Sequence, residues 1–228
     1  PVFTVGNQLK EAIELHTDRK GKEAEARAIE MLTLVGVNEP EKRVKQYPYE
    51  LSGGMRQRVM IAMALACEPD ILIADEPTTA LDVTIQAQIL ELMQSLQKKL
   101  GMAIIMVTHD LGVIADMCDE IIVMYGGRVC ERGTAEDIFY RPHHEYTKGL
   151  LRSIPNVDRI GEKLIPIPGT PINLLNMPKG CAFCPRCEEA MKICIEEQPP
   201  EMQMPDGHFA SCWLNVKAAM EEEKGGRQ

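Results

Sequence analysis

The sequence has little that would place it in a membrane, in a secretory route or on nucleic acid. It contains no run of about 18 uncharged apolar residues, and the opening PVFTVGNQLKEAI lacks the basic and apolar regions of a signal peptide. Basic residues are outnumbered, with 25 Lys and Arg against 34 Asp and Glu, and the net charge is -9. Phosphate-backbone binders usually carry a basic patch. We therefore expect a globular chain that neither spans a membrane nor binds nucleic acid.

Cysteine, by contrast, is abundant, with eight residues in the chain. Cys67, Cys118 and Cys130 lie in apolar or mixed patterns, where a free thiol behaves as a small hydrophobe. The other five crowd into residues 181 to 212. Because no export signal accompanies them, we expect reduced thiols rather than a disulfide framework.

Apolar periodicity predicts an α/β fold. The segments NQLKEAIELH and EAEARAIEMLTLVGV have helical spacing, and a further helix is expected to begin at Ser52. The short apolar runs ILIAD and AIIMVTHD, the latter at 103–110, are separated by the helical pattern VTIQAQILELMQSLQKKLG, which predicts two parallel strands buried on both faces.

Two strands joined at Gly126 and Gly127 are predicted in EIIVMYGGRVCERG, followed by a helix whose capping box pairs Thr134 with Asp137. From Ile154 onward, repeated prolines break any long element. We expect a first domain over residues 1–153 and a small appendage over residues 154–228.

Acidic and glycine-rich motifs lie where such a fold binds phosphates. Asp75 and Glu76 follow the strand ILIAD, and ligands bind beyond the carboxyl ends of parallel strands. Ser52, Gly53 and Gly54 offer backbone N–H groups at a helix start. Taken singly, each motif is equally typical of an ordinary helix cap.

The order of the motifs indicates more than each one alone. LSGGM resembles the signature of ATP-binding-cassette (ABC) ATPases, ILIADE their Walker B strand, TALD their D-loop and THD their switch-histidine loop. The resemblance covers residues 1 to about 150. It implies part of a P-loop NTPase-type domain, with a helical subdomain over 1–68 and the Walker B core over 69–153.

The resemblance also implies roles for individual residues. Asp75 would associate with Mg²⁺, Glu76 would act as catalytic base, and His109 would sense the γ-phosphate of ATP; the ordinary alternative for His109 is a helix-capping or core imidazole. The signature and D-loop residues would contact nucleotide or the dimer interface, namely Ser52, Gly53, Gly54, Met55 and Asp82.

ABC ATPases work as head-to-tail pairs, so the resemblance implies a second cassette subunit, identical or different. It also implies membrane permease subunits docked on residues 7 to 50, a location at the cytoplasmic face of the membrane, and an indirect partner in a peptide-binding protein. The sequence contains no G-x-x-x-x-G-K-[ST] loop. Because PVFTVG resembles the segment after the Q-loop, we expect a truncated natural protein in preference to a degenerate cassette.

The crowded cysteines predict a metal site. Their spacing suits Zn²⁺ or an iron–sulfur cluster, and the C-x₂-C-x₂-C start is ferredoxin-like, which favours iron–sulfur while leaving zinc open. The segment resembles the C-terminal extension of dipeptide and oligopeptide importer ATPases. That resemblance implies a [4Fe–4S] cluster on Cys181, Cys187, Cys194 and Cys212, with Cys184 as a fifth thiol. We expect His208 to have a surface or packing role.

Met55, where most cassettes have Gln, also points to the oligopeptide-importer branch. The leading hypothesis is therefore an ATPase subunit that drives import of di- or oligopeptides. The alternatives are the same ATPase class serving nickel or another solute, and a metal-binding interaction module without ATPase activity.

Overall fold

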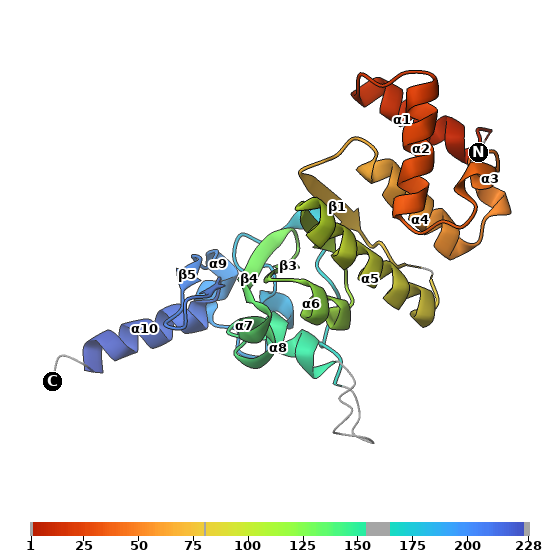
Figure 1. Ribbon diagram of the computed structural model, residues 1–228. Coiled ribbons are helices and arrows are strands. Elements are labelled where there is room, and N and C mark those ends of the chain that lie inside the picture. Colours follow the sequence, from red (N-terminus) through yellow and green to blue (C-terminus); the bar gives the residue numbers. More distant parts are fainter. Residues whose placement is uncertain (1, 80, 154–164, 226–228) are drawn as a thin grey trace. The chain divides into compact units, whose positions relative to one another are not determined.

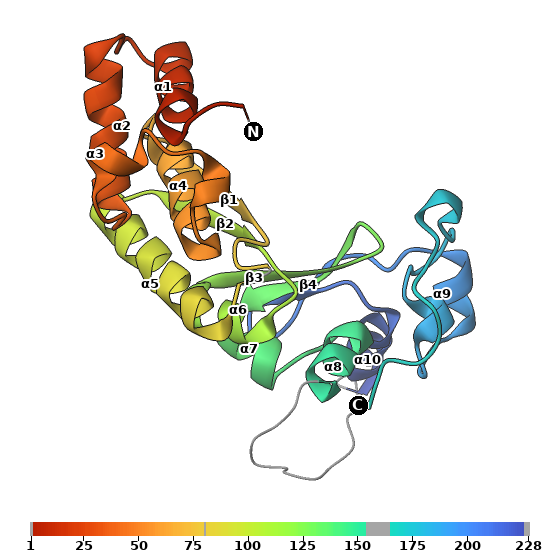
Figure 2. The same cartoon turned by 90° about the vertical axis from the view of Figure 1, so that its right-hand side faces the viewer.

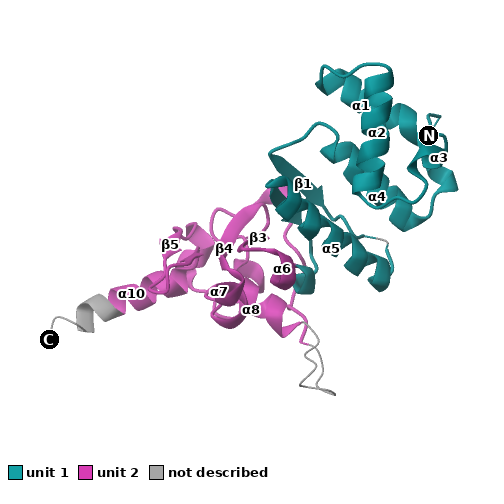
Figure 3. Cartoon of the chain, viewed as in Figure 1, with its two compact units in different colours: residues 1–113 teal, residues 114–228 magenta. Residues whose placement is uncertain are grey.

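A computed structural model describes residues 2–79, 81–153 and 165–225 of the chain. The chain forms two compact units, residues 1–113 and residues 114–228 (Figure 3). The linker predicted to begin at Ile154 falls in 154–164, outside the described residues. The predicted boundary between residues 153 and 154 therefore stays a prediction.

Helices make up the first part of unit 1. They are α1 (Val5–His16), α2 (Lys22–Leu34), the short α3 (Pro40–Arg43), a 3₁₀ turn (Pro48–Glu50) and α4 (Gly53–Leu65). α2 packs against both α1 and α4, as Figures 1 and 2 show. Leu9, Ile13, Leu32 and Leu65 are fully buried among them. The predicted helices are confirmed.

A two-stranded parallel sheet follows. β1 (Ile71–Asp75) pairs with β2 (Ala103–Val107) in a register that sets Asp75 opposite Val107, and α5 (Val83–Leu100) connects the two strands. The parallel pairing is confirmed. The short helix α6 (Leu111–Met117) begins after β2.

The expectation that both faces of these strands are buried is wrong for the described residues. Leu72 and Ala74 are buried, but their neighbours along β1 point to the opposite face and meet solvent. The reason is that no described element of unit 1 covers that face, which leaves four apolar side chains more than half exposed: Ile71, Ile73, Ile105 and Val107.

Unit 2 is built on a four-stranded antiparallel sheet. Its strands are β3 (Glu120–Tyr125), β4 (Arg128–Thr134), β5 (Met202–Gln203) and β6 (Phe209–Ala210), in the order β3-β4-β6-β5. Gly126 and Gly127 join β3 to β4 with φ of 57° and 73°, values that suit glycine and a tight hairpin turn. The predicted hairpin is confirmed.

Helices surround this sheet. α7 (Ala135–Tyr140) begins at the predicted capping box of Thr134 and Asp137, and α8 (Glu145–Arg152) follows it. The C-terminal segment adds 3₁₀ turns at Leu174–Asn176 and Cys184–Arg186, then α9 (Lys192–Glu196) and α10 (Trp213–Gly225). In the described ranges, no helix combines the length and apolar content needed to cross a bilayer.

The cysteine segment is fastened to the sheet by aromatic packing and by one arginine. Phe183 is buried and packs edge-on against Tyr125 of β3, with ring centroids 5.3 Å apart. Arg186 donates from Nε to the carbonyl of Pro168 at 2.8 Å and from Nη2 to that of Ile167 at 3.0 Å. These contacts hold residues 165–187 against the β3–β4 hairpin.

Candidate nucleotide site and cysteine pocket

The carboxyl end of β1 carries an exposed carboxylate held by two side chains. Glu76 follows the last residue of β1, and its N–H donates to the carbonyl of Val107 at 2.8 Å. Oε2 of Glu76 accepts a hydrogen bond from the Thr79 hydroxyl at 2.8 Å, and Oε1 lies 3.1 Å from Nδ1 of His109. The parallel register therefore brings two predicted catalytic residues into direct contact.

The electrostatics of Glu76 favour its ionised form. The Thr79 hydrogen bond first, and the His109 imidazole second, lower the pKa of the Glu76 carboxyl below its ordinary value. The side chain is 45% exposed. An ionised, accessible carboxylate at the end of a parallel strand can orient or deprotonate a water molecule.

Backbone geometry directs this carboxylate away from the strand. Glu76 has a φ of 45°, in the left-handed region that is uncommon for a residue with a side chain. The preceding residue, Asp75, keeps the extended backbone of β1 and is also exposed. Two adjacent carboxylates therefore leave the strand from different backbone conformations, which suits separate roles in metal binding and water activation.

The loop that carries His109 is anchored to α5. Asp110 accepts hydrogen bonds on Oδ1 from the N–H groups of Gly112 and Val113, and on Oδ2 from the Gln86 side chain at 3.1 Å. The His109 side chain is 81% exposed. It is therefore not the core imidazole that sequence reasoning kept as an alternative.

The predicted signature residues begin α4. Ser52 caps this helix, and its Oγ accepts from the N–H of Met55 at 3.4 Å. A Cβ placed on Gly54 would lie 2.8 Å from Cγ2 of Ile85 in α5, whereas one on Gly53 would have its nearest neighbour 3.6 Å away. The second glycine thus permits a close approach between α4 and the start of α5.

Asp82 has a structural role as the N-cap of α5. Its Oδ1 accepts from the N–H of Ile85 at 2.9 Å. The residues predicted to form the signature and the D-loop therefore lie at the N-termini of two adjacent helices. A helix N-terminus with open N–H groups favours an anion such as a phosphate.

All five clustered cysteines line one pocket, together with Phe183, Trp213 and neighbouring residues. The N–H of Cys181 donates to the carbonyl of Cys194 at 2.8 Å, which joins the two ends of the segment. A Cβ on Gly180 would lie 2.1 Å from that carbonyl oxygen, so only glycine fits there. The fold thus gathers the predicted ligands Cys181, Cys187, Cys194 and Cys212, with Cys184 beside them.

Burial favours the protonated form of four thiols in this pocket. It raises the pKa of Cys187 to about 12 and also raises the pKa of Cys181, Cys184 and Cys212. A metal bound here must therefore displace protons from the sulfurs. Cys130, predicted to be a small hydrophobe, is buried in the core with Tyr125 and Phe183, which confirms that prediction.

Several residues of these sites were missed by sequence reasoning. Thr79 and Gln86 support the Glu76 and His109 loops, and a hydroxyl three residues after Glu76 was an available signal for the first. His208 is buried, which fits the packing half of its predicted surface or packing role, and it does not line the cysteine pocket. It lies close to His143 and Asp206, and the spacing of these residues in the sequence does not predict that the three come together.

A parallel strand pair that ends in adjacent carboxylates and a histidine is typical of α/β domains that bind and hydrolyse nucleotides. Comparison with known proteins gives the same class. The ABC transporter family matches residues 2–79, and the family described as oligopeptide/dipeptide transporter, C-terminal region, matches residues 130–194.

The most similar curated relatives include the dipeptide transport ATP-binding protein DppD of Bacillus subtilis, 53% identical over 96% of this chain and 65% of its own length. The oligopeptide transport ATP-binding protein OppD is 55% identical in Bacillus subtilis, over 94% of this chain and 60% of that protein. The OppD protein of Haemophilus influenzae is 51% identical, over 95% of this chain and 67% of that protein. The chain thus spans about two thirds of the length of these relatives.

Solved structures agree. A dimeric, post-hydrolysis structure of the ATP-binding cassette MJ0796 with ADP and Pi is 32% identical, with a TM-score of 0.52 over 59% of this chain and 58% of that one. The chain belongs to the ABC transporter ATPase family, in the branch whose members carry the oligopeptide/dipeptide transporter C-terminal region.

Proposed function

We propose that the protein containing this chain hydrolyses ATP to drive the import of di- or oligopeptides. The observation that carries the proposal is the contact of Glu76 with His109 at the carboxyl end of the parallel strands, in a chain of this family. The names of the relatives, dipeptide and oligopeptide transport ATP-binding proteins, support peptides over nickel or another solute as cargo.

In this proposal Glu76 is the general base. Its carboxylate, kept ionised by Thr79 and His109, accepts a proton from the water that attacks the γ-phosphorus of ATP. His109 donates to Glu76 through Nδ1 and presents its other nitrogen to the γ-phosphate. Asp75 would hold Mg²⁺, and the ion would supply positive charge against the phosphates of ATP.

A complete site needs more than these 228 residues, which contain no G-x-x-x-x-G-K-[ST] loop. The proposed turnover therefore belongs to the whole protein, and we expect none from this chain alone. The signature residues Ser52, Gly53 and Gly54, with Met55, complete the site of a second cassette in a head-to-tail pair, and Asp82 lies at the interface between the two. The dimeric cassettes among the similar structures support this arrangement.

Permease subunits are the proposed membrane partners. They would hold the protein at the cytoplasmic face of the membrane and receive peptide from a separate binding protein. The exposed side chains of the helical subdomain, which include Tyr49 and Met60, are available for such contacts.

The cysteine pocket is proposed to hold a [4Fe–4S] cluster on Cys181, Cys187, Cys194 and Cys212. The four thiols line one pocket, with Cys194 buried and the other three partly exposed, and such a set of thiolates suits an iron–sulfur cluster or Zn²⁺. The ferredoxin-like C-x₂-C-x₂-C start supports the cluster over the zinc alternative. The cluster would supply a covalent cross-link to a segment with little core of its own.

Uptake of labelled peptide into vesicles that contain the assembled importer tests the proposal. We expect ATP-dependent uptake with the natural subunit and with the control variant Glu91→Gln, which changes an exposed carboxylate of α5. Loss of uptake is expected with Glu76→Gln. Uptake of nickel but not of peptide by the natural complex would establish the rival cargo instead.

A further inference from the structure

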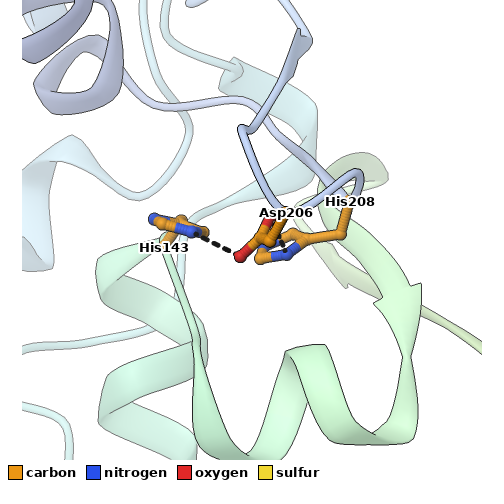
Figure 4. Close-up of side chains that lie close together, drawn as sticks. All are labelled: His143, Asp206 and His208. Atoms are coloured by element: carbon orange, nitrogen blue, oxygen red, sulfur yellow. Dashed lines mark hydrogen bonds and ion pairs between the residues drawn. The ribbon is translucent and has the colours of Figure 1, made fainter.

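Three side chains of unit 2 come together outside both sites already described. His143 lies between α7 and α8, whereas Asp206 and His208 lie in the turn between β5 and β6 (Figure 4). One potential ligand atom from each lies within 4.8 Å of the others. Residues more than sixty positions apart are thus brought to one point.

His208 has more acceptors around it than a neutral imidazole can serve. Its Nε2 lies 3.1 Å from Oε1 of Glu131, and both side chains are fully buried. Its Nδ1 lies 3.0 Å from Oδ1 of Asp206 but makes no hydrogen bond, because the angles are wrong for one. If Nε2 carries the proton for Glu131, a lone pair on Nδ1 faces a carboxylate, and a cation between them would remove that repulsion.

The spacing of the three groups suits such a cation. Nε2 of His143 lies 3.4 Å from Oδ2 of Asp206, and the His143 and His208 rings have centroids 4.6 Å apart. Zn–N bonds of about 2.0–2.1 Å place neighbouring ligand atoms of a tetrahedral site roughly 3.3 Å apart. The separations at Asp206 are of that order, 3.0 Å from Oδ1 to Nδ1 of His208 and 3.4 Å from Oδ2 to Nε2 of His143, so the carboxylate turns a different oxygen toward each histidine.

Glu131 fixes the orientation of His208. Its carboxylate also accepts from the N–H of His143, and from the N–H of His144 at 3.1 Å, so it cannot turn away. A histidine ligand that donates its second nitrogen to a buried carboxylate is the usual outer arrangement of protein zinc sites. The same carboxylate therefore positions both histidine-bearing segments.

The charges also favour a divalent ion. Three carboxylates, those of Glu131, Asp137 and Asp206, face the cluster, and Arg141 supplies one positive charge through contacts with Asp137 at 2.5 Å and Asp206 at 3.7 Å. With neutral histidines the sum is three negative charges against one positive, or -2. One divalent ion balances that charge.

We propose that His143, Asp206 and His208 bind one divalent transition metal ion of the zinc class, with Glu131 as the positioning residue for His208. Imidazole and carboxylate are suitable ligands for zinc, and three protein ligands leave a fourth position for water. The ion would fasten the β5–β6 turn to the segment between α7 and α8. It is separate from the cysteine pocket, which none of the three residues lines.

Cobalt(II) titration of the anaerobically purified chain, read as difference spectra so that the absorbance of an iron–sulfur cluster cancels, tests the site. Thiolate ligands give near-ultraviolet charge-transfer bands with Co²⁺ that nitrogen and oxygen ligands do not. We expect one equivalent of Co²⁺ with visible ligand-field bands and no accompanying thiolate band. His143→Gln, at a side chain that is 30% exposed, should weaken this equivalent at least about tenfold, as should Asp206→Asn. The control His16→Gln, in an exposed histidine of α1, should leave it unchanged.

Equal Co²⁺ binding by His143→Gln, Asp206→Asn and His16→Gln would overturn the proposal, as would spectra of the thiolate kind only. Imidazole ¹⁵N spectra with saturating Zn²⁺ give a second measurement on the unmutated chain. A metal-shifted Nδ1 of His208 supports the site. Protons retained on both nitrogens would show an imidazolium between two carboxylates and refute it.

Discussion

Nδ1 of His109 lies 3.1 Å from Oε1 of Glu76, although the two residues are 33 positions apart in the sequence. The register of β1 and β2 accounts for this contact, because Asp75 is paired with Val107 and the next residues of both strands leave the sheet at the same edge. In the proposed function Glu76 is the general base and His109 the phosphate-sensing histidine, and this contact would place the two at one nucleotide.

Thr79 is expected to assist Glu76 in the whole protein. Thr79→Val removes the hydroxyl that donates to Oε2 of Glu76 at 2.8 Å, and we expect kcat for ATP hydrolysis to fall about tenfold, the equivalent of about 1.4 kcal/mol. Thr79→Ser keeps the hydroxyl and should stay close to the natural rate. Steady-state hydrolysis by the two variants checks this, and equal rates would show that the hydrogen bond has no part in turnover.

Gly54 is expected to be intolerant of a methyl group. A Cβ would lie 2.8 Å from Cγ2 of Ile85, so Gly54→Ala should lower the free energy of unfolding by about 1–3 kcal/mol. Gly53→Ala is the matched control, since its nearest neighbour would be 3.6 Å away. Urea unfolding measures both, and combining Gly54→Ala with Ile85→Ala should recover part of the loss. Equal stability of the two single variants would contradict the packing described for α4 and α5.

Acid should weaken unit 2 through His144. Burial lowers the pKa of His144 from 6.5 to about 4, and its Nδ1 accepts from the N–H of Tyr146 at the start of α8. In the unfolded chain the imidazole of His144 binds a proton below about pH 6.5, whereas in the folded chain it does so only near pH 4. The free energy of unfolding therefore decreases as the pH is lowered from about 6.5 to about 4. At about pH 5 the loss is on the order of 2 kcal/mol.

His144→Asn keeps an N-cap for α8 and removes the titration. Its unfolding free energy should fall by less than that of the natural chain between about pH 7 and pH 5. Urea titrations at the two pH values measure the difference. The same pH dependence in both proteins would show that His144 is not the responsible group.

Substitution of a proposed cluster ligand should remove iron from the cysteine pocket, whereas substitution of the fifth thiol, Cys184, should not. The chain purified without oxygen is expected to be brown and to contain iron, to lose that iron in Cys187→Ser, and to keep it in Cys184→Ser. Both side chains are partly exposed, so the comparison is matched for burial. Iron analysis with visible absorbance reads the outcome. Colourless protein that holds only zinc would refute the cluster, and equal iron loss in both variants would refute the assignment of ligands.

Much of the fold could be predicted because local signals decide it. Ser52 begins a helix where the sequence predicted one, Thr134 and Asp137 form the predicted capping box, and the Gly126–Gly127 turn follows from the positive φ that glycine accepts. The parallel pairing of β1 and β2 follows from the strand–helix–strand order.

The rest depends on tertiary contacts that no local pattern encodes. No periodicity in the sequence predicts that one face of the β1–β2 sheet is uncovered and that Ile73 is exposed there. No spacing predicts that His143 lies close to His208. Thr79 was missed because a threonine in a turn has several ordinary uses. The sequence therefore predicted Glu76 and His109 as site residues, but it did not predict Thr79 and Gln86, whose hydrogen bonds support them.

ATP hydrolysis by the whole protein carrying Glu76→Gln tests the central claim most directly. Glutamine keeps the size of the side chain and removes the carboxylate that accepts the proton, so we expect kcat to fall at least about a hundredfold with ATP binding retained. Glu91→Gln should hydrolyse ATP at the natural rate. Undiminished hydrolysis by Glu76→Gln, with nucleotide bound as tightly as in the natural protein, would contradict the account.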